Sequence, residues 1–188
     1  SRISVKDKVI LLGPNHTGFG ASFSIMTQGV WKTPLGQAKI DAELANALLV
    51  NSKYLKSDAM AHAYEHSLEV ELPILQYFKQ DFQIVPIAFM TDDIKALKEV
   101  GREIAGVLKQ SGDKEKAILV ASSDMTHYES HESAKKKDAE AINAILELDE
   151  DKLFEKIKSL DITMCGYAPV IAMLSAAKEL GAKKAQLV

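Results

Sequence analysis

Three segments of the chain carry histidine, aspartate and cysteine, the side chains that bind metal ions and transfer protons. His16 ends a Gly-Pro-Asn-His run, Asp124 and His127 lie three residues apart, and Cys165 is the single cysteine. Imidazole and thiolate together suit iron, copper or zinc. The spacing of Asp124 and His127 allows the carboxylate to orient the imidazole or to reach a metal. These residue types therefore predict a metal site or acid–base chemistry.

Cys165 directly precedes a predicted helix that begins near Gly166. Unpaired N–H groups and the positive end of the helix dipole favour a thiolate, which is both a nucleophile and a metal ligand. Two alternatives stay open, a small buried side chain without chemistry and a Cys–His pair with His16 or His127 for acyl transfer. One cysteine excludes an internal disulfide and a structural zinc site of three or four cysteines, and favours a reducing, cytoplasmic compartment.

Apolar runs alternate with segments of helical periodicity along the chain. The predicted strands cover 8–12, 82–90 and 117–121, and the predicted helices cover 41–50, 65–79, 91–108, 133–146, 149–158 and 166–180, with a further strand beginning at 184–188. Asp41 and Thr91 are the expected caps of their helices. Pro73 predicts a kink or a helix start, and Pro86 an edge or irregular position in its strand. The alternation predicts an α/β domain with a mostly parallel central sheet covered by helices.

The predicted sheet brings the chemical side chains together. In parallel α/β sheets, ligands bind beyond the carboxyl ends of the strands. The strand at 8–12 is followed by Asn15 and His16, and the strand at 117–121 by Ser123, Asp124 and His127. We therefore expect these side chains at one rim. Taken alone, each histidine is more often a solvated loop residue, and Asp124 is equally compatible with a turn or helix cap.

Composition restricts the class of protein. The 188 residues are 47% hydrophobic and 26% charged with a net charge of −3, which is typical of one globular domain over 1–188. No basic field is present, so nucleic-acid binding is not expected. The longest uncharged stretch, 9–31, contains a proline and four glycines and is no membrane span. Rossmann, P-loop and Gly-x-Ser-x-Gly motifs are absent from the sequence.

Five motifs in order resemble the Memo-like family, protein B of the AmmeMemoRadiSam system. They read Leu-Gly-Pro-Asn-His-Thr-Gly from Leu12, Trp-Lys-Thr-Pro-Leu-Gly from Trp31, Glu-His-Ser-Leu-Glu-Val-Glu-Leu-Pro from Glu65, Ser-Ser-Asp-Met-Thr-His from Ser122 and Met-Cys-Gly-Tyr-Ala-Pro from Met164. The motifs span most of the chain. Each one alone is a weak signal, but five in the family's order are specific.

The resemblance implies a fold like that of class III (LigB-type) non-haem iron extradiol dioxygenases, with a metal-capable pocket. It implies that His16 and Cys165 are metal ligands, and that Asp124 and His127 accompany them, His127 as the acid or base. His66 matches the Glu-His-Ser motif and is expected to line the pocket. The implied ion is Fe(II), with Cu or Zn as alternatives.

The resemblance also implies two hypotheses about function. One hypothesis is a metal-dependent, dioxygenase-like redox enzyme acting on an unknown substrate. The other is a non-catalytic protein that binds a metal, a small molecule or a peptide. The family also implies a functional link to a radical-SAM protein. Because the family's first ligand histidine precedes the Gly-Pro-Asn-His strand and further strands follow the present end, the chain is expected to be a fragment lacking both family termini.

Overall fold

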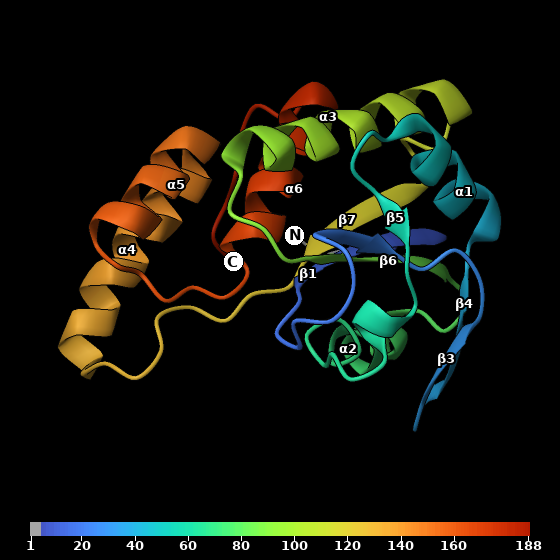
Figure 1. Cartoon of the computed structure of the whole chain (residues 1–188), viewed down its shortest axis with the longest axis horizontal. Helices are drawn as coiled ribbons and strands as arrows, with labels where there is room; N and C mark the ends of the chain where they lie inside the picture. Colours follow the sequence, from blue (N-terminus) through green and yellow to red (C-terminus); the bar gives the residue numbers. More distant parts are fainter. Residues whose placement is uncertain (1–4) are drawn as a thin grey trace.

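The computed structural model describes residues 5–188, and a mostly parallel sheet forms its centre (Figure 1). The described strands are β1 (Lys8–Pro14), β2 (Phe23–Ile25), β3 (Val30–Thr33), β4 (Gly36–Ile40), β5 (Lys56–Ser57), β6 (Gln83–Phe89) and β7 (Ala117–Ala121). The main path runs β3-β4-β6-β1-β7, while β2 pairs with β6 and β5. β4, β6, β1 and β7 are parallel to one another, whereas β2 is antiparallel to β6 and β3 to β4. The predicted α/β class is confirmed.

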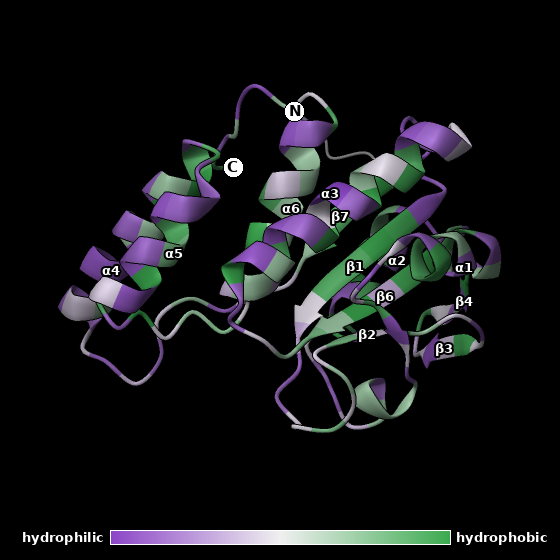
Figure 2. Cartoon of the chain, turned by 45° about the horizontal axis from the view of Figure 1, so that its top comes forward, coloured by the Kyte–Doolittle hydropathy of each residue, from purple (hydrophilic) through white to green (hydrophobic). Residues whose placement is uncertain are grey.

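The core lies on both faces of β1 and β6. In β1 the four residues from Val9 to Leu12 have no exposed surface, and both strands are mostly hydrophobic in Figure 2. Continuous rather than alternating burial is what a parallel strand shows when both of its faces are covered. β7 differs, because every one of its residues is partly exposed. It pairs with β1 and ends the described strand order.

Of the two positions predicted for Pro86, the edge strand is wrong, because β6 lies between β1 and β4. The pairing of β4 ends opposite Ile84, and that of β2 begins opposite Ile87. The Pro86 carbonyl accepts a hydrogen bond from the Met26 N–H at 3.2 Å. Since the nitrogen and carbonyl of one strand residue face the same side, the missing proline N–H falls at the junction between β4 and β2, where neither ladder continues.

Helices cover both faces of the sheet. The described helices are α1 (Ala42–Asn51), the 3-10 turn η1 (Met60–His62), α2 (Glu71–Phe78), α3 (Ile94–Ser111), α4 (His131–Leu146), α5 (Glu150–Ser159) and α6 (Tyr167–Glu179). Figure 1 shows α1, α3 and α6 on one side of the sheet and α2 on the other, with α4 and α5 as a pair beside it. α3 and α6 approach so closely that a side chain at Gly101 would meet the Ala172 carbonyl oxygen at 2.2 Å.

Short polar side chains begin most of the helices. Asp41, Asp93, Ser130 and Asp149 each accept a hydrogen bond from an N–H in the first turn that follows. Such caps satisfy donors that have no partner within the helix. The predicted cap Asp41 is confirmed. The prediction that Thr91 caps α3 was wrong. Asp93 is the cap, because it directly precedes the helix and accepts hydrogen bonds from two N–H groups of the first turn.

Two further predictions about elements were wrong. The helix expected over 65–79 begins only at Glu71. In the turns before it, the Glu65 carboxylate accepts hydrogen bonds from the backbone N–H groups of His66 and Ser67. Pro73 falls in the first turn of α2, where its missing N–H costs no helical bond. Residues 184–188 form no strand. Among the described helices, none has the length and apolar character needed to cross a bilayer.

Candidate functional site

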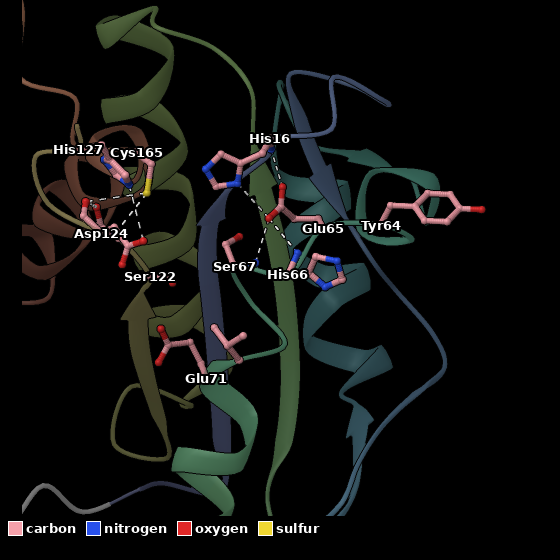
Figure 3. Close-up of a pocket in the computed structure, with 12 residues that line it drawn as sticks. His16, Tyr64, Glu65, His66, Ser67, Glu71, Ser122, Asp124, His127 and Cys165 are labelled. Atoms are coloured by element: carbon pink, nitrogen blue, oxygen red, sulfur yellow. Dashed lines mark hydrogen bonds and ion pairs between the residues drawn. The ribbon is translucent and has the colours of Figure 1, made fainter.

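A cavity of about 380 Å³ lies beyond the carboxyl ends of β1 and β7 (Figure 3). The loop after β1, the segment before α2, the loop after β7 and the turn before α6 all contribute to it. Its lining includes His16, Glu65, His66, Ser67, Ser123, Asp124, His127 and Cys165. Parallel strands carry both loops to the same edge of the sheet, as the sequence predicted.

One wall holds three ligand-type side chains in a tight group. The ligand atoms of Asp124, His127 and Cys165 all lie within 4.8 Å of one another. Asp124 Oδ2 is 3.7 Å from His127 Nε2, and the Asp124 side chain is 86% exposed. The group therefore converges on one point while remaining open to the cavity. Cys165 joins it from the turn before α6, 41 residues further along the chain than Asp124.

Thr163 fixes the ring of His127. The His127 backbone N–H donates to Thr163 Oγ1 at 2.7 Å, and His127 Nδ1 lies 2.7 Å from the Thr163 carbonyl oxygen. Because a carbonyl only accepts, Nδ1 must carry the proton. The lone pair of the neutral ring is then on Nε2, the nitrogen that faces Asp124.

The Cys165 sulfur is held by backbone rather than by charged side chains. The Asp124 N–H donates to Cys165 Sγ at 3.2 Å, and the Gly166 N–H donates to Ser123 Oγ at 2.9 Å. A side chain at Gly166 would meet the Ser122 carbonyl oxygen at 2.2 Å. The glycine therefore lets the start of α6 lie directly against the loop after β7, which brings the thiol to Asp124.

On the opposite wall, Glu65 orients His16. The Glu65 carboxylate accepts hydrogen bonds from the His16 backbone N–H and, at 3.1 Å, from His16 Nδ1. It also accepts from the backbone N–H groups of His66 and Ser67, each at 2.9 Å. His16 is therefore protonated on Nδ1, and Figure 3 shows its other nitrogen directed across the cavity toward the side of Cys165.

These hydrogen bonds set the charge of Glu65. Burial by itself would raise the pKa of this carboxyl, but the hydrogen bonds from His16 and Ser67 outweigh burial and lower the pKa to about 2. Glu65 is only 5% exposed. A buried carboxylate that accepts several N–H bonds stays ionised because those bonds favour the charged form. Glu65 is thus a fixed anion beneath the imidazole of His16.

The Gly-Pro-Asn-His and Glu-His-Ser motifs pack directly on each other. Ser67 Oγ donates to the Pro14 carbonyl oxygen at 2.9 Å. A side chain at Gly13 would meet Leu68 Cδ2 at 2.5 Å. Leu68 itself has no exposed surface. The glycine therefore makes room for Leu68, and this packing places Glu65 under His16.

The remaining predicted pocket residues have different positions. His66 and Ser123 line the cavity, with His66 Nδ1 3.1 Å from Glu69 Oε1. Asn15 was expected to line it and is not among its lining residues. The Asn15 side chain closes its own turn instead, because it accepts from the N–H and hydroxyl of Thr17 and donates to the carbonyl of Phe19, as Asn does in turns.

Sequence reasoning missed Glu65 and Thr163 as parts of the site. Both lie within or beside motifs that were noticed, since Glu65 precedes His66 and Thr163 lies two residues before Cys165. Their partners His16 and His127 are 49 and 36 residues away. Periodicity cannot predict such contacts. Imidazoles that bind a metal usually donate their second N–H to a carboxylate or a carbonyl. This rule indicates that such partners exist, but not which residues they are.

The donor set of the wall fits a transition-metal ion. Asp124 supplies an oxygen, His127 the unprotonated Nε2 and Cys165 a sulfur. These three ligand atoms lie within 4.8 Å of one another. Three electron-pair donors that face one another can share one cation. Mixed N, O and S ligands suit iron, copper or zinc rather than magnesium or calcium. His16 lies across the same cavity and is not one of these three.

Comparisons with known proteins agree with the motifs. A MEMO1 family protein of Methanocaldococcus jannaschii is 46% identical over 184 residues, covering 96% of this chain and 63% of the relative. One of Saccharolobus islandicus is 46% identical over 178 residues, covering 94% and 62%. The chain thus spans slightly less than two thirds of the length of these relatives. A third, of Methanococcoides burtonii, is 43% identical and is covered to 70%.

A solved structure shares the fold. The crystal structure of an uncharacterized protein from Escherichia coli K12 superposes with a TM-score of 0.63 at 17% identity, over 91% of this chain and 75% of that chain. At this identity the likeness concerns the fold alone. The sequence profile described as "Memo-like protein" matches residues 2–188. Together with the three relatives, this match shows that the chain belongs to the Memo-like family.

Proposed function

We propose that the protein binds a transition-metal ion in the cavity at the carboxyl ends of β1 and β7. Fe(II) is the proposed ion, with Cu or Zn as alternatives. The observation that carries this proposal is the group of Asp124, His127 and Cys165, whose ligand atoms lie within 4.8 Å of one another. Thr163 supports the group, because its carbonyl fixes the proton of His127 on Nδ1 and so leaves Nε2 free as a ligand.

His16 is the proposed fourth ligand from the opposite wall. Glu65 holds its Nδ1 proton, so that Nε2 is the nitrogen available to the ion. This arrangement assigns Asp124 and His127 to metal binding rather than to the proton transfer that the family resemblance implied. The two assignments differ experimentally, because a ligand variant loses the ion whereas a proton-transfer variant keeps the ion and loses turnover.

A metal-dependent redox reaction is the proposed activity. The bound ion would supply Lewis-acid or one-electron chemistry. The chain contributes the orientation of the ligands, through Thr163 and Glu65, and an open cavity of about 380 Å³ beside them. That space suits a small molecule or the side chain of a peptide. A non-catalytic role in holding or delivering the ion uses the same site without turnover.

The test is metal binding by the purified protein under anaerobic conditions. Fe(II) and redox-inert Zn²⁺ are titrated, and the bound ion is quantified by elemental analysis after desalting. The variants are Cys165→Ala, His127→Ala and His16→Ala. His131→Ala is the matched control, because His131 is an exposed histidine at the start of α4. We expect one ion per chain in the wild type and the control, with at least tenfold weaker binding in Cys165→Ala and His127→Ala.

The outcomes separate the assignments. Equal metal content in wild type and Cys165→Ala would refute the site. Full metal content in His127→Ala would return His127 to the role of an acid or base. For the redox activity, the loaded protein is incubated with O₂ and a panel of catechols, and oxygen consumption is followed. A stoichiometric ion without turnover on any substrate class tested favours the non-catalytic role.

A further inference from the structure

A second cavity of about 340 Å³ lies on the other side of Glu65. Among the described residues, Glu65 alone lines both cavities. Met26, Trp31 and Leu72 supply large apolar surfaces to the second cavity. The Trp31 indole N–H donates to Met26 Sδ at 3.4 Å, so the polar atom of the indole is already used. A mostly apolar hollow with a few polar groups is the usual form of a small-molecule site.

A buried histidine without a full set of partners lines this cavity. His62 is 8% exposed, and its Nε2 lies 3.2 Å from the Ser24 carbonyl oxygen. The carbonyl requires the proton on Nε2, which makes Nδ1 an acceptor. Among the described residues Nδ1 has no hydrogen-bond partner. Burial lowers the pKa of His62, against the opposing influence of the Ser24 carbonyl, Asp58 and Glu65, so the ring is neutral near pH 7.

The charges around the cavity favour a cationic ligand. Glu65 and Glu69 contribute two carboxylates, whereas Lys32 contributes one ammonium group. The balance is therefore negative. Trp31 lies beside His62, with ring centroids 6.0 Å apart, and an indole ring attracts cations through its face. An anionic ligand would meet two carboxylates, and only Lys32 would attract it.

We propose that this second cavity binds an organic amine with a compact apolar body. The apolar body packs against Trp31, Met26 and Leu72, and the ammonium group is attracted by Glu69 and by the Trp31 ring. The His62 ring lines the cavity beside Trp31 and, being neutral, adds no positive charge to it. The site is separate from the proposed metal centre and requires no metal.

Trp31 makes the proposal directly measurable, because it is the only tryptophan of the chain. Its fluorescence therefore reports on this cavity alone. Metal-free protein in phosphate buffer, which contains no competing amine, is titrated with 2-phenylethylamine. Phenylacetate and 2-phenylethanol serve as the matched anion and neutral molecule. We expect a saturable fluorescence change with the amine, and at least tenfold weaker binding of the other two.

Two variants test the assigned residues. Glu69→Gln and His62→Phe are each expected to weaken amine binding at least fivefold. Glu71→Gln, which removes an acidic group that lines the first cavity and not the second, is expected to bind the amine as the wild type does. Glu69 has an exposed side chain, so its variant preserves the test if His62→Phe fails to fold. Absence of saturable binding, equal binding of phenylacetate, or unchanged affinity in Glu69→Gln would overturn the proposal.

Discussion

Glu65 and His16 are joined by two hydrogen bonds across 49 residues of sequence. The carboxylate takes both the backbone N–H and the ring N–H of the histidine, so the position and the tautomer of the ring are fixed together. The carboxylate is buried and ionised. The pair directs Nε2 of His16 to the cavity before any ligand binds. This reduces the entropy cost of ordering the side chain on binding.

Replacing Glu65 by Gln should destabilise the protein and release His16. The amide NH₂ cannot accept from the N–H groups that the carboxylate now satisfies, which costs about 1–3 kcal/mol of unfolding free energy. Urea unfolding measures this loss. The ¹⁵N shifts of the His16 ring report the tautomer, and we expect a mixture in Glu65→Gln. Glu69→Gln, whose side chain is 57% exposed, is the control and should stay within about 0.5 kcal/mol of the wild type.

Metal binding should protect Cys165 from alkylation. The chain has one cysteine, so iodoacetamide labelling followed by mass spectrometry reports on this thiol alone. A coordinated thiolate has its lone pair engaged by the ion, and we expect Zn²⁺ to slow labelling at least tenfold. His127→Ala should remove most of the protection. Labelling at the same rate with and without Zn²⁺ would contradict the proposed ligand set.

Gly166→Ala should disrupt the approach of α6 to the loop after β7. The added methyl group would lie 2.2 Å from the Ser122 carbonyl oxygen and 2.4 Å from Ser123 Cβ, so the backbone must shift, at a cost of about 2–4 kcal/mol. Metal affinity should fall with stability, because Cys165 moves with this turn. Gly106→Ala is the matched control within α3. In the part of the chain that the structure describes, no neighbouring atom lies within 4 Å of its new methyl group, and a stabilisation of up to about 1 kcal/mol is expected.

His62 should make stability depend on pH in the mildly acidic range. Its pKa in the folded protein is lowered by burial from 6.5, so the unfolded chain takes up a proton at a pH where the folded chain does not. Stability from this group is complete above pH 6.5 and falls as the pH drops below it. His62→Gln, which does not titrate, should lose less stability between pH 7.5 and 5.5 than the wild type in urea unfolding. An equal loss in both proteins would show that other groups dominate.

The α/β class and the shared rim could be predicted because their causes are local. Continuous apolar runs such as 8–12 form buried strands, and parallel strands place their following loops at the same edge. The sequence therefore predicted His16, Asp124 and His127 at one rim, and the family resemblance added Cys165. The short strands β2 to β5 carry no comparable apolar run, and they join the sheet by pairing with β6 or with one another. Periodicity did not predict them.

By itself, the sequence determined the family, the main strands and helices, and the chemical types of the ligands. The tertiary structure decided which of these side chains meet. Asp124, His127 and Cys165 come together because Gly166 has no side chain to keep α6 away from the loop after β7. His16 lies on the opposite wall because the carboxylate of Glu65 holds it there. Contacts between residues 36 to 49 positions apart depend on the packing of whole elements, and no local pattern encodes them.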